Sequence, residues 1–123
     1  MTQENIERYY EIREALNDQQ KLVLNCFQNN PDTKFQRQEL LFILQCNELL
    51  ETGRLNVWKT INNVSPRITE LKQQGHLIET ESVTKTIKNP LGFELQHTAH
   101  EYQFIGIELF IRMQENEQME LIF

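Results

Sequence analysis

Residues 64–79 read VSPRITELKQQGHLIE, and both ends of a helix are marked in this stretch. Ser65 can cap a helix through its hydroxyl, and Pro66 suits the first helical position, where its missing N–H is no loss. Gly75 can end the helix in a left-handed turn. We therefore predict a helix that begins at Pro66 and ends just before Gly75.

The apolar residues of this stretch share one side of the predicted helix. Val64, Ile68 and Leu71 recur at spacings of four and three, as on the packed face of an amphipathic helix. The opposite side and its flanks carry polar and charged residues, namely Arg67, Thr69, Glu70, Lys72 and Gln73. One side is expected to pack in a core, and the other is free to meet a partner.

The size and composition of the chain favour one globular domain. It has 123 residues, of which 39% are hydrophobic and 24% charged. Its apolar runs are too short to cross a bilayer, and the start, MTQENIERYY, lacks the apolar segment of a signal peptide. We predict a cytoplasmic protein, 1–123 as a single domain, with no membrane partner. Cys26 and Cys46 are predicted to be free thiols, because neither belongs to a CxxC motif.

Charge is distributed unevenly along the sequence. The net charge is −6, yet residues 54–88 hold six basic and three acidic residues, while the remainder holds six basic and fifteen acidic residues. A basic middle with acidic flanks favours a local anionic partner over a protein that coats nucleic acid by overall charge. Chance clustering on a solvated surface is the alternative.

Periodicity and turn signals divide the rest of the chain. Helices are expected over 4–16, over 18–30 with Asp18 as cap, and from Arg37 to about 50. A short helix over 57–62 follows, with Trp58 in the core and a turn at Asn62-Asn63. Strands are expected at 77–83 and 101–105, separated by about 17 residues that include a turn at 89–92, and the tail is expected to be helical.

From Leu16 to Phe104 the order of elements resembles a winged helix-turn-helix domain, in particular the small bacteriophage versions and the MarR-like regulators. The resemblance rests on LNDQQKLVLNCF (16–27), KFQRQEL (34–40), INNVSPRITELKQQGHLIE (61–79) and the wing TKTIKNPLGFELQHTAHEYQF (84–104). It implies an α+β, mostly helical fold. The resemblance predicts a winged helix core over 18–105 with a two- or three-stranded antiparallel wing sheet. Extra terminal segments, an N-terminal helix at 1–17 and a segment at 106–123, flank this core.

The resemblance implies sequence-specific binding of double-stranded DNA by a transcriptional regulator or a phage accessory protein, with neither catalysis nor a cofactor. A helix fits the major groove and offers side chains to the base edges there. Arg67, Thr69 and Gln73 are the candidates for base edges. Lys72 and the turn residues Asn62 and Asn63 would contact phosphates, and Lys85 and Lys88 of the wing would reach phosphates or the minor groove. Ser65, at the start of the helix, is a further candidate contact. For Arg67 the alternative is an i,i+3 ion pair with Glu70 on a wet surface.

Other functions have weaker sequence support. His97 and His100 form an HxxH pair without a further ligand, so no metal site is predicted, and no GxSxG, P-loop or HExxH motif occurs. The acidic flanks favour a second hypothesis, a winged-helix protein-interaction module that does not bind DNA. A homodimer through the termini is expected from their apolar residues, namely Tyr9, Ile12, Leu16, Ile107, Phe110, Ile111 and 121–123.

Overall fold

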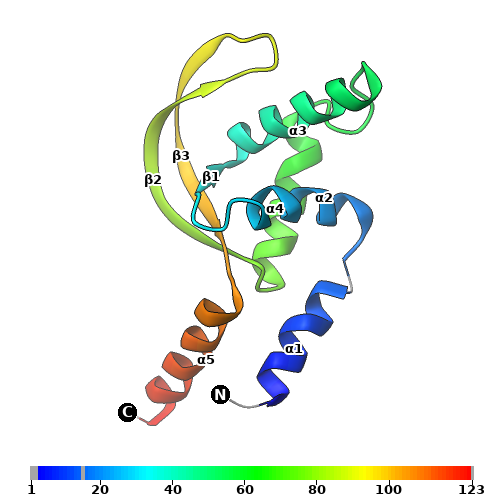
Figure 1. The fold of residues 1–123 in the computed structure, drawn as a ribbon. Coiled ribbons are helices and arrows are strands. Elements are labelled where there is room, and N and C mark those ends of the chain that lie inside the picture. Colours follow the sequence, from blue (N-terminus) through cyan, green and yellow to red (C-terminus); the bar gives the residue numbers. More distant parts are fainter. Residues whose placement is uncertain (1–2, 15, 123) are drawn as a thin grey trace.

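The computed structural model describes residues 3–14 and 16–122, and it shows an α+β fold that is about half helical (Figure 1). The elements are α1 (Gln3–Glu14), α2 (Asp18–Gln28), β1 (Phe35–Gln36), α3 (Arg37–Thr52), α4 (Ile61–Gln73), β2 (Leu77–Lys88), β3 (Glu94–Phe104) and α5 (Ile107–Ile122). The strands form one antiparallel sheet in the order β1-β3-β2. The predicted α+β class, the antiparallel sheet and the helical tail are confirmed.

The hairpin β2–β3 is longer and tighter than the sequence predicted. Pairing runs from Leu77 opposite Phe104 to Lys88 opposite Glu94, so the 17-residue connection expected between two short strands is wrong. The connection is short because the Asn89 side chain accepts hydrogen bonds from the N–H groups of Leu91 and Phe93, at 3.0 and 2.9 Å. The hairpin curves past the helices over its whole length (Figure 1).

Helix α4 begins earlier than the sequence predicted. Its N-cap is Thr60, whose N–H donates to Asn63 Oδ1 at 2.9 Å, and Pro66 lies inside the helix. The cap at Ser65 and the turn at Asn62-Asn63 are therefore wrong, as is the helix over 57–62, because residues 53–60 have no regular structure. At the other end Gly75 takes a φ of 86° and follows the helix, as predicted.

The cap of α2 is shifted by one residue from the prediction. Asn17, rather than Asp18, accepts a hydrogen bond from the N–H of Gln20 at 2.9 Å, and Gln20 Oε1 accepts one from the N–H of Asn17 at 3.1 Å. This reciprocal pair is a capping box. Asp18 becomes the first helical residue, where its charge still suits the positive end of the helix dipole.

The packed face of α4 was predicted correctly. Val64, Ile68 and Leu71 are fully buried, and they join one core with residues of α2, α3 and the sheet. Trp58 belongs to this core, as expected. The core fixes α4 against the other elements and leaves its outer face exposed.

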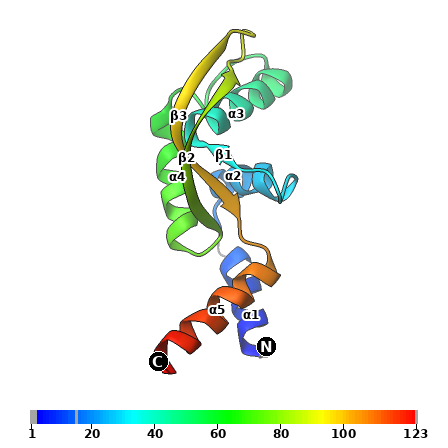
Figure 2. The same cartoon turned by 90° about the vertical axis from the view of Figure 1, so that its left-hand side faces the viewer.

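Helices α1 and α5 form a separate pair beside the main core (Figure 2). Tyr9 of α1 and Phe110 of α5 stack edge to face with ring centroids 5.5 Å apart, and Ile105 is buried with them. Apolar residues at the two ends of the chain are thus covered by each other. The side chains of Ile12 and 121–123 lie outside the described part of the chain.

A buried carboxylate organises the loop that leads into α4. Glu48, near the end of α3, accepts hydrogen bonds from the N–H groups of Asn56, Val57 and Trp58 at 3.2, 2.9 and 3.1 Å. Burial raises the pKa of Glu48, but the hydrogen bonds from these three N–H groups outweigh burial, so the pKa lies below its ordinary value. The charged form of Glu48 therefore stabilises the loop.

Replacing Glu48 by glutamine is expected to lower the free energy of unfolding by about 1 kcal/mol at neutral pH, because a charged acceptor becomes a neutral one. Since the folded-state pKa is lowered, the contribution of Glu48 is present above its ordinary pKa of 4.5 and is lost as the pH falls through the folded-state value. Urea titrations between pH 7 and pH 3 should show the difference between the two proteins shrinking with acidity. A difference that stays constant over this range would contradict the assignment.

Candidate nucleic-acid interface

One end of the molecule combines three segments that are distant in sequence. The loop after α3, the first turn of α4 and the turn of the hairpin lie at the end opposite to α1 and α5 (Figures 1 and 2). We call this region, residues 53–63 and 88–93, the tip end. The tip end thus contains the first residues of α4 and the turn between β2 and β3.

The exposed face of α4 carries most of the predicted DNA contacts. Asn62, Asn63, Thr69, Lys72 and Gln73 are exposed, whereas Ser65 and Arg67 are partly buried. Asn62 and Asn63 lie in the first turn, at the tip end. Gln73 lies in the last turn, where the chain leaves for β2. The predicted contacts are therefore spread along the whole length of the helix.

Arg67 is engaged within the protein. Its Nε lies 2.6 Å from Glu70 Oε1, and its Nη1 donates to Gln19 Oε1 of α2 at 3.1 Å. This is the i,i+3 pairing that the sequence analysis gave as the alternative to base recognition. A base contact by Arg67 would require this ion pair to open.

Arg37, which the sequence analysis assigned only to the start of α3, braces α4 from the side. Its Nη1 donates to the carbonyl and the hydroxyl of Ser65, at 2.6 and 2.5 Å, and to Thr69 Oγ1 at 3.1 Å. Its Nε donates to the hydroxyl of Tyr102 at 3.0 Å. Ser65 and Thr69 thus hold α4 to the first residue of α3, which in turn bonds Tyr102 of β3. No local sequence motif indicates that Arg37 binds α4, because its partners are 28 to 65 residues away in the chain.

The same network extends to Lys72. The Tyr102 hydroxyl donates to Glu79 Oε1 at 2.7 Å, and Lys72 Nζ lies 3.4 Å from Glu79 Oε2. The hydrogen bond from Tyr102 has the largest influence on the pKa of Glu79 and lowers it. Lys72 therefore has a charged partner at the junction of α4 and β2.

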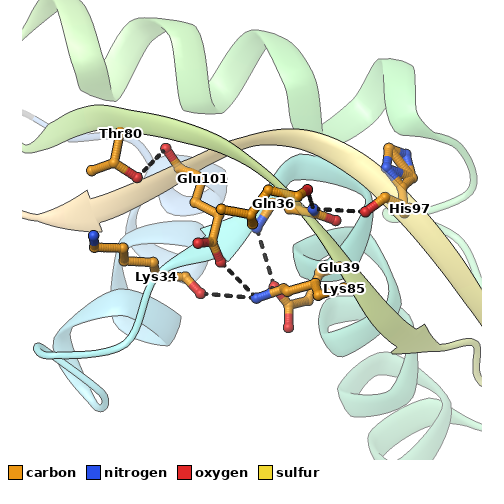
Figure 3. Close-up of polar contacts among 8 residues, drawn as sticks. Lys34, Gln36, Glu39, Thr80, Lys85, His97 and Glu101 are labelled. Atoms are coloured by element: carbon orange, nitrogen blue, oxygen red, sulfur yellow. Dashed lines mark hydrogen bonds and ion pairs between the residues drawn. The ribbon is translucent and has the colours of Figure 1, made fainter.

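Lys85, in the half of β2 nearer the hairpin turn, is held by two carboxylates (Figure 3). Its Nζ lies 2.6 Å from Glu39 Oε1 and 2.8 Å from Glu101 Oε2, and it donates to the carbonyl of Lys34 at 3.2 Å. Burial lowers the pKa of Lys85, but the hydrogen bonds with Glu101 and Glu39 more than offset burial, so the pKa is raised. Lys85 fixes the hairpin to α3 and to the residue that precedes β1, and a phosphate would have to displace these partners.

Gln36 strengthens the same junction. It is fully buried, and its Nε2 donates to the carbonyls of Val83 and His97, at 2.9 and 3.0 Å (Figure 3). One side chain of β1 therefore links both strands of the hairpin. Together with Lys85, this linkage sets the angle at which the hairpin leaves the body of the protein.

Three cations of the basic middle segment have no ion pair. Among the residues that the structure describes, Arg67, Lys72 and Lys85 have a carboxylate within 4.0 Å, whereas Arg54, Lys59 and Lys88 have none and are exposed. Arg54 and Lys59 belong to the loop, and Lys88 begins the hairpin turn. All three therefore lie at the tip end. Lys88 was among the predicted DNA contacts, whereas Arg54 and Lys59 were not, because the fold decides that their loop lies at the same end of the molecule as the hairpin turn.

Comparison with protein-family models, curated proteins and solved structures found no match for this chain. Over the described residues, no group of three or more His, Cys, Asp or Glu side chains is placed to hold a metal ion. His100 instead contacts the carbonyl of Thr80 through Nδ1 at 2.8 Å. In the same part of the chain, no helix is both long and apolar enough to span a bilayer.

Proposed function

We propose that this protein binds double-stranded DNA through the tip end, as a cytoplasmic transcriptional regulator or phage accessory protein without catalytic activity. The observation that carries the proposal is that three exposed cations without ion pairs, Arg54, Lys59 and Lys88, belong to the loop before α4 and to the end of β2, which lie at the same end of the molecule as the first turn of α4 (Figure 1). A cation without an ion pair in the free protein can bind a phosphate without first losing the free energy of that pair. The element order α2-β1-α3-α4-β2-β3, with β1 paired to β3, is compatible with a winged helix.

The proposed roles differ between the two ends of α4. Asn62 is exposed in the first turn, and an asparagine can form two hydrogen bonds to an adenine edge in the major groove. Arg54, Lys59 and Lys88 would hold the flanking phosphates. Arg67 and Lys72 are less suited to these roles because Glu70 and Glu79 already balance their charges.

Selection of duplexes from a random pool tests this proposal, and an enriched sequence is expected. Replacing Asn62 by alanine should then weaken binding to that sequence by roughly tenfold and leave binding to other sequences unchanged, because a lost base contact penalises only the correct base. Gln74→Ala is the matched control, because Gln74 is exposed at the C-cap of α4 and is not among the candidate contacts, and this variant should bind like the wild type. Failure to enrich any duplex, with no binding at low salt, would reject the proposal.

A protein-interaction module is the second candidate, and a specific surface favours it. A hollow of about 450 Å³ lies between α2 and the end of α3, and Leu22 and Leu50 stand exposed at its edge. Half of the cations in the basic segment, namely Arg67, Lys72 and Lys85, are also paired with carboxylates of the protein itself. Heparin chromatography separates the candidates, because a DNA-binding protein should be retained and released by moderate salt, whereas an interaction module of this charge should flow through.

We also propose that the α1–α5 pair forms a homodimer interface. Tyr10 of α1 is 54% exposed next to the buried Tyr9, so an aromatic surface remains beside the helix pair. Light scattering should give the mass of a dimer for the full chain, and Tyr10→Arg should give a monomer, because a charge replaces an apolar contact. A monomer for the unaltered chain at all concentrations would disprove the interface.

A further inference from the structure

The turn of the hairpin presents large apolar side chains to solvent. Leu91 is 82% exposed and Phe93 is 67% exposed, at the point farthest from the α1–α5 pair (Figure 2). The cross-strand pairs behind them on the hairpin include polar ones, such as Thr84 with Thr98 and Lys88 with Glu94. The apolar character is therefore concentrated at the extremity.

This apolar turn is held in one conformation by its own hydrogen bonds. The Asn89 N–H donates to the carbonyl of Phe93 at 2.9 Å, and the Asn89 side chain accepts from the N–H groups of Leu91 and Phe93. Gly92 takes a φ of 91°, which a residue with a side chain rarely adopts, and its N–H donates to the Asn89 carbonyl at 3.0 Å. Ordering Leu91 and Phe93 for binding therefore costs little backbone entropy.

The shape of the hairpin limits what it can bind. A turn at the end of a two-stranded ribbon is narrow and convex, so it can insert into a groove of a partner but offers no pocket of its own. Its immediate neighbour Lys88 is exposed, and the other cations without ion pairs, Arg54 and Lys59, lie at the same end of the molecule. A partner with an apolar interior and an anionic rim meets both requirements. Duplex DNA has this combination when a base step opens, because the faces of the bases are apolar and phosphates flank the groove.

We propose that Leu91 and Phe93 act as an apolar wedge, which enters an opened base step from the minor groove and bends the duplex. This inference rests on the proposed function. Leucine and phenylalanine are among the side chains that intrude between base pairs in architectural DNA-binding proteins. Unstacking a step costs energy, and burial of the two side chains together with the added phosphate contacts offsets that cost.

Salt dependence distinguishes the wedge from a charge contact. On the duplex selected from the pool, Phe93→Ala and Leu91→Ala should each weaken binding about tenfold at every salt concentration, with the salt slope unchanged, because neither side chain releases counter-ions. Lys88→Gln should instead reduce the magnitude of that slope by about one. Leu22→Ala, a partly exposed apolar residue on α2, is the matched control and should bind like the wild type.

A duplex with a mismatch provides a second test. Base pairs at a mismatch are already less stably stacked, so less free energy is needed to open that step. The wild type should bind a duplex with one mismatch at the entry step about tenfold more tightly than the paired duplex, and the Leu91→Ala/Phe93→Ala variant should show no such gain. Selective binding with normal affinity and the same mismatch gain in that variant would overturn the wedge and leave the proposed function standing. No binding of any duplex by the wild type would overturn both.

Discussion

Replacing Leu71 by alanine is expected to lower the free energy of unfolding by about 2 to 5 kcal/mol, because a large, fully buried side chain is removed. Leu71 is fully buried in the core shared by α2, α3 and the sheet, in the last turn of the helix. Removing its side chain leaves a cavity that the fixed neighbours on α2 and α3 can fill only in part. Urea titration followed by circular dichroism measures the loss.

Gln73→Ala is the control for Leu71→Ala on the same helix. Gln73 is exposed two residues further on, and its replacement should change the free energy of unfolding by less than about 0.5 kcal/mol. Equal losses in the two variants would mean that the buried and exposed faces of α4 are assigned incorrectly. The proposed contact of Asn62 with a base would then have no support.

The second large effect is expected at Lys85. Lys85→Met should lower the free energy of unfolding by about 2 kcal/mol, because Glu39 and Glu101 would remain close together without their shared cation. Fully buried pairs lose about 3 to 5 kcal/mol in such an experiment, and the smaller figure reflects the partial exposure of these side chains. Thermal and urea melts of the two proteins would measure the change.

A triple variant provides the control for Lys85→Met. Combining it with Glu39→Gln and Glu101→Gln should restore most of the stability, since no unpaired charge remains and the amide oxygen introduced at position 39 can still accept the N–H of Gln36. If Lys85→Met leaves stability unchanged and weakens DNA binding instead, Lys85 contacts phosphate, as the sequence resemblance implied.

The sequence predicted those features of the fold that depend on neighbouring residues. The spacing of Val64, Ile68 and Leu71 placed the packed face of α4, and Gly75 placed its end, because side-chain periodicity and left-handed turns are local properties. Trp58 was assigned to the inward face of a short helix, and it does lie in the core, although that helix does not form.

The start of α4 was mispredicted because two local signals compete. Ser65-Pro66 resembles a helix start, but Thr60 and Asn63 form the actual cap five residues earlier, and Arg37 then bonds the Ser65 carbonyl beside the proline. A proline inside a helix is normally unfavourable. The Arg37 contact joins residues 28 positions apart, so no local pattern indicates it.

Charge was the least predictable property of the candidate site. The basic segment 54–88 was expected to supply cations generally, yet Glu39 and Glu101, both outside that segment, neutralise Lys85. Ion pairs between residues so far apart in the chain depend on tertiary structure and leave no pattern in sequence. The cations that stay without a pair, Arg54, Lys59 and Lys88, could be recognised only after the partners of the others were known.

The salt dependence of DNA binding tests most directly whether the tip end contacts phosphates. We predict a slope of log K against log salt of about −3 for the wild type, because three cations would release counter-ions. Lys88→Gln should reduce its magnitude by about one, whereas Lys72→Gln, which removes a cation already paired with Glu79, should leave it unchanged. Equal changes in the two variants, or no binding by the wild type at low salt, would contradict the account.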